Sequence, residues 1–525
     1  MRIIARPGPA AGLVADAIAD ARGLVRGVMA GDPRAWGEHA DAARTWTGWR
    51  RAPDEMRAQV PALEALVAGA RDQGIRHVLV MGMGGSSLSP EVTRRTFGHA
   101  SGIELRILDS TDPVAVQRAT DGVDPTTCLA ITSSKSGTTA EPLAFLAHVG
   151  QFLRDALGDA TRDHLIAITD AGTPLARRAQ DEGWRMVATN PPDVGGRFSA
   201  LTLFGLIPMA FAGVPLTPLL DLARDARADS APVHLGVALA ALAQAGRDKL
   251  TIVADPGIGS FGLWLEQLVA ESLGKAGGGI VPVADEPLGD PGGYGSDRVL
   301  VHLRLTGEHD ADVAAIGATG IPVFVLDIRT PLDVAGLYMG LEVAVAAAGA
   351  VMGINPFDQP DVQAAKEAAH RALGGDGIRR DERGEPEDIV QAVEMLGRGD
   401  YLALLAFTTP TPGGARSLAA MRAAVRARTR AATTAGWGPR FLHSTGQLHK
   451  GGPGSGVFVQ FLGPGAPDLP IPGQDHTFGD LLRAQAVGDA EALGAVGRRV
   501  VRIALGDDPE AGLRRAAAAL GAAGT

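Results

Sequence analysis

The sequence is poor in cysteine and in aromatic residues. Its 525 residues include one cysteine, Cys128, and aromatic side chains make up 4% of the chain. A single cysteine excludes an intramolecular disulfide framework and a zinc site built from several thiolates. Cys128 opens the apolar run CLAIT, so we expect it to be a small core residue.

An excess of positive charge and a long apolar run are also absent. The chain carries 49 basic and 59 acidic residues, which gives a net charge of −10. This balance argues against wholesale nucleic-acid binding but leaves room for a local basic pocket that holds a small anion. No uninterrupted apolar run reaches 18 residues, and the N-terminus meets an acid too early for a signal peptide. We therefore expect a soluble, cytoplasmic protein without a membrane segment.

Lysine is the rarest charged residue. An ammonium group exchanges its proton readily, whereas a guanidinium group stays charged and binds as a planar fork. The few lysines are therefore worth examining individually. Four of them lie in glycine- or hydroxyl-rich segments, and Lys249 opens an apolar strand and looks incidental. The five are Lys135, Lys249, Lys275, Lys366 and Lys450, against 44 arginines.

Short apolar runs alternate with helix-like segments through most of the chain. Residues 1–75 are expected to form helices around a tryptophan-containing surface segment. Strand followed by helix, several times over, is typical of βαβ units, which form a parallel sheet with helices on both faces. The predicted strands are 77–82, 103–110, 127–134 and 164–170 and, after a helical stretch, 249–255, 279–283, 298–305 and 321–327.

The length predicts two or three domains of the α/β class. We place a helical segment at 1–75, a doubly wound parallel-sheet domain at 76–246 and a second at 247–375. Residues 371–388 are polar and glycine-rich, as expected of a linker. The remainder, 376–525, is predicted to be a C-terminal α/β extension, with strands at 401–407, 454–462 and 499–505.

Two turns that follow predicted strands are rich in glycine or hydroxyl groups. Ligands bind outside the carboxyl ends of the strands in such sheets. In MGMGGSS, residues 81–87, glycines allow the backbone to approach a ligand. In SSKSGTTAE, residues 133–141, several hydroxyls and Lys135 precede a helix, which suits a phosphate monoester. The alternative is simple helix capping, for which one hydroxyl suffices. Neither turn matches a Walker A loop or a dinucleotide-binding fingerprint.

Three further segments carry candidate catalytic groups, each with a plain structural alternative. In ESLGK, Glu271 and Lys275 share a helix face and form either an ordinary ion pair or a carboxylate base beside a cation. In NPFDQPDVQAAK, Gln359 and Lys366 lie seven residues apart, or two helical turns, and so share one helix face. That face is either part of the site or simply exposed to solvent. In GGRFS, Arg197 follows two glycines, either to meet an oxyanion or within a structural turn.

Taken together, these segments resemble the phosphoglucose isomerase family. MGGSSLSP, SSKSGTT, GGRFS, ESLGK and NPFDQPDVQAAK occur in the family's order across about residues 70–370. The resemblance implies two sugar-isomerase domains. It is closest to the isomerase half of fused transaldolase–phosphoglucose isomerases, because of SSKSGTT and the later FLHSTGQLHKGG. About 75 residues precede the first turn, too few for a (β/α)₈ transaldolase barrel.

The chain departs from the family in the position of its histidine motif. The family's ring-opening histidine normally lies between the glutamate segment and the lysine helix, where this chain has only His302 inside a predicted strand. LHSTGQ occurs instead at 442–447, so we expect His443 to be the displaced histidine. The alternative is that HSTG is a turn in which His443 is only a cap. Asp361 and Gln363 also stand where the family usually has Gly and Glu.

The resemblance implies an aldose–ketose isomerase that interconverts glucose 6-phosphate and fructose 6-phosphate through an enediolate. Glu271 would move the proton between C1 and C2, Arg197 would stabilise the enediolate oxygen, and Lys366 and His443 would open the ring. No metal or cofactor is expected, and the family usually forms homodimers. The substrate-binding residues would be Gly85, Ser86, Ser134, Lys135, Ser136, Thr139 and Gln359.

Three alternatives remain open. The enzyme could also accept mannose 6-phosphate, or another sugar phosphate, because substrate choice depends on the shape of the pocket. The chain could be a non-catalytic sugar-phosphate sensor, although the candidate acid and bases argue against that. The C-terminal extension could be a separate interaction module, with catalysis confined to the first 375 residues.

Overall fold

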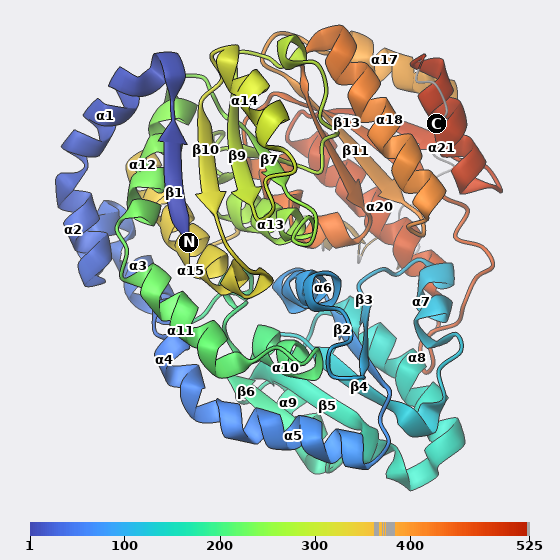
Figure 1. Ribbon diagram of the computed structural model, residues 1–525. Helices are drawn as coiled ribbons and strands as arrows, with labels where there is room; N and C mark the ends of the chain where they lie inside the picture. Colours follow the sequence, from blue (N-terminus) through green and yellow to red (C-terminus); the bar gives the residue numbers. More distant parts are fainter. Residues whose placement is uncertain (362–366, 370, 372, 374–383, 522–525) are drawn as a thin grey trace.

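The computed structural model describes residues 1–361, 367–369, 371, 373 and 384–521. It contains three α/β units, each built on a mainly parallel sheet (Figure 1). The sheets have strand orders β3-β2-β4-β5-β6, β1-β10-β9-β7-β8 and β12-β11-β13-β14. The predicted α/β class is therefore confirmed.

The first sheet is parallel throughout. Four of its strands follow the predicted apolar runs, and β6 was not predicted because it is short and only partly buried at the sheet edge. The strands are β2 (His77–Gly82), β3 (Glu104–Leu108), β4 (Cys128–Ser133), β5 (Leu165–Asp170) and β6 (Met186–Asn190). The helices of this unit are α6 (Gly85–Phe97), α7 (Pro113–Thr120), α8 (Ala140–Leu157), α9 (Pro174–Asp181) and α10 (Leu203–Phe211).

The second sheet has one antiparallel edge strand, which comes from the N-terminus. Arg2–Arg6 forms β1 and pairs with β10, so the expectation of an entirely helical start is wrong. The other strands are β7 (Lys249–Ala254), β8 (Val281–Ala284), β9 (Arg298–Arg304) and β10 (Val323–Asp327). The helices are α11 (Leu216–Arg227), α12 (Ala231–Gln244), α13 (Phe261–Leu273), α14 (Asp310–Ala318) and α15 (Val334–Met352).

The tryptophans of the N-terminal segment are mainly core residues and not surface residues. Trp36 is 3% exposed and donates its indole N–H to the carbonyl of Ala346 at 2.9 Å. Trp49 is 1% exposed and stacks on Phe198 of the first unit. The segment therefore ties the first two units together. Its helices are α1 (Ala11–Asp20), α2 (Arg22–Ala30), α3 (Ala40–Trp46), α4 (Ala52–Glu55) and α5 (Val60–Asp72).

The third unit is a four-stranded parallel sheet with helices on both sides. Three strands match the predicted runs, and β12 was missed because ATTAGW lacks a continuous apolar run. The strands are β11 (Tyr401–Phe407), β12 (Ala432–Trp437), β13 (Gly456–Leu462) and β14 (Arg499–Ala504). The helices are α17 (Ile389–Glu394), α18 (Pro412–Thr429), α19 (Gly446–Gly451), α20 (Phe478–Ala495) and α21 (Pro509–Ala519).

Among the described residues, one helical stretch, Pro331–Met352, is long and apolar enough to cross a membrane by composition. It includes α15, which packs against α11, α12 and α13, and 89% of its most apolar window is buried inside the protein. Its sequence was not recognised as one apolar run because Glu342 interrupts it. The stretch is therefore accounted for as a core helix.

Buried polar contacts join the third unit to the other two. Arg422 of α18 is 3% exposed and donates to the carbonyls of Ala284 and Asp285 in the second unit. Arg440 forms a bidentate ion pair with Asp109 of the first unit, at 2.7 and 2.8 Å. Because these contacts are desolvated and specific, the third unit is fixed against both others.

Candidate functional site

A cavity of about 580 Å³ opens at the carboxyl ends of β2, β4 and β5. It extends from the first unit to α13 of the second and to η11 (Arg440–His443) of the third. Its lining includes Gly84, Gly85, Ser86, Ser133, Ser134, Lys135, Ser136, Thr139, Asp170, Thr173, Gly196, Arg197, Gln267, Glu271, Gln359 and His443. All the predicted site residues except Lys366, which lies outside the described residues, therefore surround one space.

A larger cavity, of about 1030 Å³, lies at the amino ends of β7, β9 and β11. Helices α12, α14 and α18 end beside it, so its walls carry the partly negative carbonyl ends of helices. Parallel α/β proteins bind ligands at the opposite, carboxyl ends of their strands. The smaller cavity is therefore the better candidate.

Two glycines in the turn after β2 are required by close contact. A Cβ atom at Gly85 would lie 1.9 Å from the carbonyl oxygen of Gly196. A Cβ atom at Gly84 would lie 2.7 Å from the carbonyl oxygen of His443, and Gly84 has a φ of +58°. This turn therefore brings the arginine segment and the histidine motif together, which sequence reasoning did not anticipate.

The hydroxyl-rich loop lies between β4 and the N-terminus of α8. Ser134 donates to the hydroxyl of Thr139 at 3.0 Å, and Ser136 accepts from the backbone N–H of Thr138 at 3.2 Å. The hydroxyl of Ser133 is buried and has no hydrogen-bond partner among the described residues. Several hydroxyls and the positive end of an 18-residue helix thus face the cavity, a combination that suits an anion.

Lys135 is paired with an acid that sequence reasoning missed. Its ammonium group contacts the carboxylate of Asp170 at the end of β5, and the carbonyl of Pro192 at 3.3 Å. It also lies 5.4 Å from the ring centre of Trp46. Burial raises the pKa of Asp170 above its ordinary value, while Lys135 opposes that rise. Part of the positive charge at this end of the cavity is therefore already balanced.

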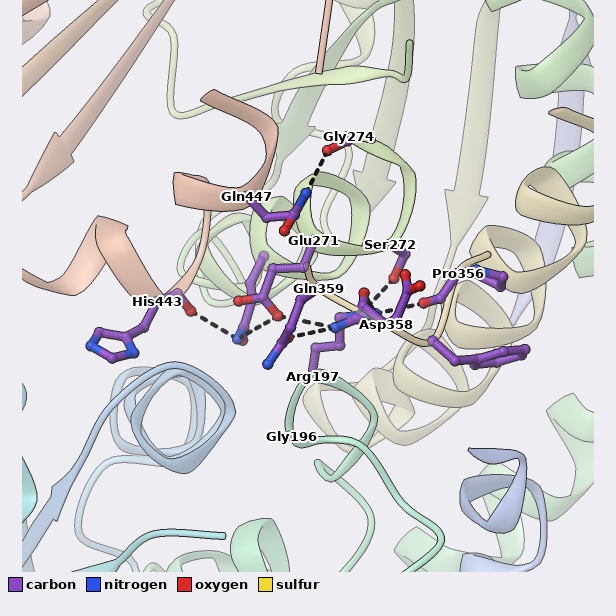
Figure 2. A network of polar contacts seen from close by, with 12 residues as sticks. Gly196, Arg197, Glu271, Ser272, Gly274, Pro356, Asp358, Gln359, His443 and Gln447 are labelled. Atoms are coloured by element: carbon purple, nitrogen blue, oxygen red, sulfur yellow. Dashed lines mark hydrogen bonds and ion pairs between the residues drawn. The ribbon is translucent and has the colours of Figure 1, made fainter. Parts of the chain in front are cut away.

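Glu271 and Arg197 form a buried pair at the other side of the cavity (Figure 2). The Glu271 carboxylate lies 3.4 Å from Arg197 Nη1 and 3.4 Å from Gln267 Nε2, which is one turn earlier on α13. Burial raises the pKa of the Glu271 carboxyl, and the positive charge of Arg197 works against this rise. The long contacts leave a carboxylate that is only loosely held.

The Arg197 guanidinium, by contrast, is held on every side. Nε donates to Ser272 Oγ at 2.9 Å, and Nη1 donates to Gln359 Oε1 at 2.9 Å. Nη2 donates to the carbonyls of Pro356 and Asp358, at 2.7 and 2.9 Å. Arg197 is 3% exposed, so these bonds replace its hydration. Gln359 therefore lines the cavity and also holds the Arg197 guanidinium in place.

Lys275 does not pair with Glu271 in the structure. Helix α13 ends at Leu273, and the chain then turns so that Lys275 Nζ bonds the Asp358 carboxylate at 2.7 Å and the carbonyl of Asp358 at 2.6 Å. It also bonds the carbonyl of Asn355. Burial, with the nearby charge of Arg197, lowers the pKa of Lys275 to about 8. Lys275 therefore holds the loop at residues 355–358 in place, and carbonyls of the same loop accept hydrogen bonds from Arg197.

His443 lies at the end of η11 and reaches the cavity from the third unit. Its carbonyl accepts a hydrogen bond from Gln267 Nε2 at 3.0 Å, and its ring Nε2 lies 2.8 Å from Glu141 Oε1. Figure 2 shows the ring directed away from Glu271. A positive charge on the ring would favour ionisation of Glu271. Glu141, in the first turn of α8, was not singled out because a helix start commonly carries an acid.

The rest of the histidine motif is structural. His449 is buried against Phe441 and Phe458, and burial holds its pKa far below the ordinary value. Lys450 is 6% exposed and forms an ion pair with Asp489 of α20 at 2.6 Å. Only the first histidine of FLHSTGQLHKGG lines the cavity.

Gln447 links the motif to two of the other predicted segments. Its Nε2 donates to the carbonyl of Gly274 at 3.1 Å and to the Asp361 carboxylate at 2.5 Å. Its Oε1 accepts from the backbone N–H of Asp361 at 2.9 Å. Asp361, which departs from the family pattern, thus has a defined partner, whereas Gln363 lies outside the described residues. His302 is buried in β9 and paired with Asp255 at 2.8 Å, away from the cavity.

Metal binding finds no support in the part of the chain that the structure describes. Within it, no three His, Cys, Asp or Glu side chains are grouped so that they could hold an ion. The side chains that line the cavity offer carboxylates, a guanidinium, an ammonium, an imidazole and hydroxyl groups.

Fold and cavity together define an α/β protein with a hydroxyl-rich loop on one unit and a buried acid on the next. A family model described as phosphoglucose isomerase matches residues 43–218. A glucose-6-phosphate isomerase from Thermus thermophilus is 31% identical over 353 residues, which cover 57% of this chain and 84% of that protein. The enzyme from Rubrobacter xylanophilus is 29% identical over 391 residues, 63% of this chain and 90% of the relative. The chain belongs to the phosphoglucose isomerase family.

Solved structures agree on the fold. A hypothetical protein from Thermus thermophilus matches with a TM-score of 0.60 and 26% identity, over 71% of this chain and all of that one. A glucose-6-phosphate isomerase from Chlamydia trachomatis matches with a TM-score of 0.51 and 20% identity, over 61% of this chain and 73% of that chain.

Proposed function

We propose that the protein interconverts glucose 6-phosphate and fructose 6-phosphate through an enediolate, as an aldose–ketose isomerase. The observation that carries this proposal is the Glu271–Arg197 pair, which lines the same cavity as the hydroxyl-rich loop. A loop of this kind suits a phosphate, and a buried carboxylate beside a guanidinium suits proton transfer next to a developing oxyanion. Membership of the phosphoglucose isomerase family supports the same reaction.

Binding would begin at the phosphate. The hydroxyls of Ser134, Ser136 and Thr139 would donate to its oxygens, and the N-terminus of α8 would attract its charge. Lys135 would add positive charge while remaining close to Asp170. Gly85 and Ser86 would line the sugar. Anchoring the phosphate would fix the sugar carbons relative to Glu271, so that the proton transfer occurs within one bound geometry.

Isomerisation needs one base that can also return the proton. Ionised Glu271 would take the proton from C2 of the open-chain aldose, and the C1 oxygen would gain the electron pair of the carbonyl. The fixed charge of Arg197 would stabilise the enediolate oxygen. Protonated Glu271 would then deliver its proton to C1, and the hydroxyl proton on O2 would pass to the C1 oxygen as the carbonyl forms at C2. Burial raises the pKa of Glu271, which makes the carboxylate a stronger base and its acid form easier to reach, so both halves of the cycle are favoured.

Ring opening needs a proton removed from the anomeric hydroxyl and another delivered to the ring oxygen. We assign this step to His443 and to Lys366, whose side chains exchange protons readily. The carboxylate of Glu141, 2.8 Å from the His443 ring, supports the assignment because it accepts from Nε2 and leaves Nδ1 free to exchange a proton.

The test is Glu271→Gln, which keeps the shape of the side chain and removes the base. We expect kcat for glucose 6-phosphate to fall by about 10²–10⁴-fold, the usual contribution of a general base. Binding of fructose 6-phosphate, measured by calorimetry, should change little. Turnover at the parental rate would show that Glu271 is not the base.

The substrate range and the sensor alternative can be decided in one coupled assay. Glucose 6-phosphate and mannose 6-phosphate are offered separately to the parent protein. Turnover of both would extend the proposal to a dual isomerase. Tight binding of fructose 6-phosphate without turnover of either substrate would contradict the isomerase proposal and favour the sensor alternative.

We further propose that the chain corresponds to the isomerase half of fused transaldolase–phosphoglucose isomerases, on the strength of SSKSGTT and LHSTGQ. We also propose a cytoplasmic homodimer. Sedimentation equilibrium of the purified protein would measure its mass against the 54.0 kDa of one chain.

A further inference from the structure

Three hydrogen bonds connect the first unit, helix α20 and the His443 ring. Thr111, in the loop after β3, donates its hydroxyl to Gln485 Oε1 at 2.7 Å. Gln485 Nε2 donates to Glu141 Oε1 at 2.7 Å. The same carboxylate oxygen lies 2.8 Å from His443 Nε2. Thr111 is fully buried, and Gln485 and Glu141 are each 6% exposed.

The direction of these bonds follows from the chemistry of the groups. An ionised carboxylate only accepts hydrogen bonds, so Gln485 must present its NH₂ group to Glu141. The amide oxygen of Gln485 then faces Thr111, whose hydroxyl can donate to it. The carboxylate therefore sets which end of the amide faces it, and the bond from Thr111 holds the other end in place.

Two donors from the third unit converge on one oxygen of Glu141. One is Gln485 of α20 and the other is the His443 ring at η11, so the carboxylate oxygen accepts hydrogen bonds from two different elements. Loss of one of these donors would leave the buried carboxylate oxygen less completely hydrogen-bonded and its position less well fixed. A shift of that oxygen would weaken its bond to the His443 ring.

We infer that Gln485 is a positioning residue for the isomerase reaction, oriented by Thr111 and acting through Glu141 on the His443 ring. This inference rests on the role proposed above for His443 in ring opening. It also gives the third unit a second contribution to the site, since α20 supplies Gln485 while η11 supplies His443. The contact between units is then part of the catalytic arrangement and not only a structural joint.

The experiment compares Gln485→Leu and Thr111→Val with a matched control at the same junction, Thr409→Val. Thr409 bonds Asp112, next to Thr111, but does not contact Glu141 in the structure. We expect Gln485→Leu to lower kcat for glucose 6-phosphate by about 10- to 100-fold, as removal of a group that orients a functional histidine typically does. Thr111→Val should show a smaller loss of kcat. Thr111→Ser keeps the hydroxyl and should retain most of the parental turnover. Thr409→Val should keep the parental kcat.

A double-mutant cycle separates positioning from general structural damage. In a His443→Ala background, Gln485→Leu should lower kcat by less than about 2-fold, because the ring through which it acts is gone. The ring ¹⁵N signals of His443, in protein labelled at histidine, should show a protonated Nε2 in the parent and a mixture of tautomers in Gln485→Leu. Circular dichroism and thermal unfolding would establish that each variant is folded.

The outcomes are distinguishable. If His443→Ala is inactive while Gln485→Leu and Thr111→Val both turn over at the parental rate, the positioning role is wrong and the role of His443 stands. If Gln485→Leu costs the same factor with and without the His443 ring, its effect is structural and the inference is overturned. If His443→Ala turns over at the parental rate, the proposed ring-opening role fails first, and the network has no catalytic ring to position.

Discussion

Two of the buried carboxylate–cation pairs in the described part of the chain are built in opposite ways. In the third unit, Asp489 is fully buried, lies 2.6 Å from Lys450 Nζ and accepts a second bond from Gln460 at 2.8 Å. In the cavity, Glu271 lies 3.4 Å from both its partners, Arg197 and Gln267. The first carboxylate has short bonds to both oxygens, whereas the second has two long bonds to one oxygen.

The difference shows which of the two pairs can do chemistry. A carboxylate with short, directed bonds is fixed in place by its surroundings and contributes mainly to the packing of its unit. A loosely held carboxylate beside a cavity can accept and return a proton, and burial raises the pKa of Glu271 while its long bonds offset that rise only in part. Burial is common to both sites, so the hydrogen bonds decide the role.

Lys450→Met should have the largest effect on stability. It leaves Asp489 buried without its cation, which typically costs about 3–5 kcal/mol of unfolding free energy. The measurement is urea unfolding followed by circular dichroism. Turnover per folded molecule should remain within about 2-fold of the parent, because Lys450 does not line the cavity.

The control is the double variant Lys450→Met/Asp489→Leu, which removes both charges and should recover a large part of the lost stability. If Lys450→Met unfolded at the parental urea concentration, the pair would not be a stabilising element and the contrast with Glu271 would disappear.

Arg197→Met should have the opposite effects: a large loss of activity and a smaller loss of stability. Removal of the charge beside the enediolate oxygen should lower kcat/KM by about 10²–10³-fold. The loss of stability should be smaller than for Lys450→Met, because Glu271 can be neutralised by taking up a proton. Arg197 holds the pKa of Glu271 down against burial, so its removal raises that pKa further. Only the ionised carboxylate is a base, so the acid limb of the kcat/KM profile should move to higher pH.

The matched control is Arg197→Lys, which keeps a charge but cannot reproduce the fork that bonds Ser272, Gln359 and two carbonyls. It should lose activity while shifting the acid limb less than Arg197→Met does. An acid limb at the same pH in all three proteins would mean that the limb does not report Glu271.

Much of this arrangement was predictable from the sequence, because local patterns determine it. Apolar runs between turns located most of the strands, and the ends of β2 and β4 carry the glycine- and hydroxyl-rich turns that line the cavity. These features depend on a few neighbouring residues. The edge strands β1, β6 and β12 were missed because short, partly polar strands are specified by their pairing partners and not by their own composition.

The partners of the candidate residues were not predictable, because they are brought together by tertiary contacts. Glu141, Asp170 and Gln485 have ordinary local sequences, and only the fold places them against His443, Lys135 and Glu141. The pairing of Glu271 with Lys275, suggested by helical spacing, failed because α13 ends at Leu273, before the second residue. Helix spacing is informative only while the helix continues.

Lys275→Arg should give the smallest effect, and it is visible only at alkaline pH. The pKa of Lys275 is lowered to about 8, so the parent loses this ammonium charge as the pH rises through that value. The turn at residues 355–358 then loses a cation that holds two carbonyls and the Asp358 carboxylate, and Arg197 is anchored to the same turn. We expect kcat/KM of the parent to decline a few-fold above about pH 8.

The arginine variant stays charged, so its profile should remain flat over the same range, even if its plateau is lower. Lys275→Gln, which is neutral at every pH, should show the parent's alkaline rate already at pH 7. An alkaline decline of equal size in the parent and in Lys275→Arg would assign that limb to another group and would leave Lys275 as a packing residue.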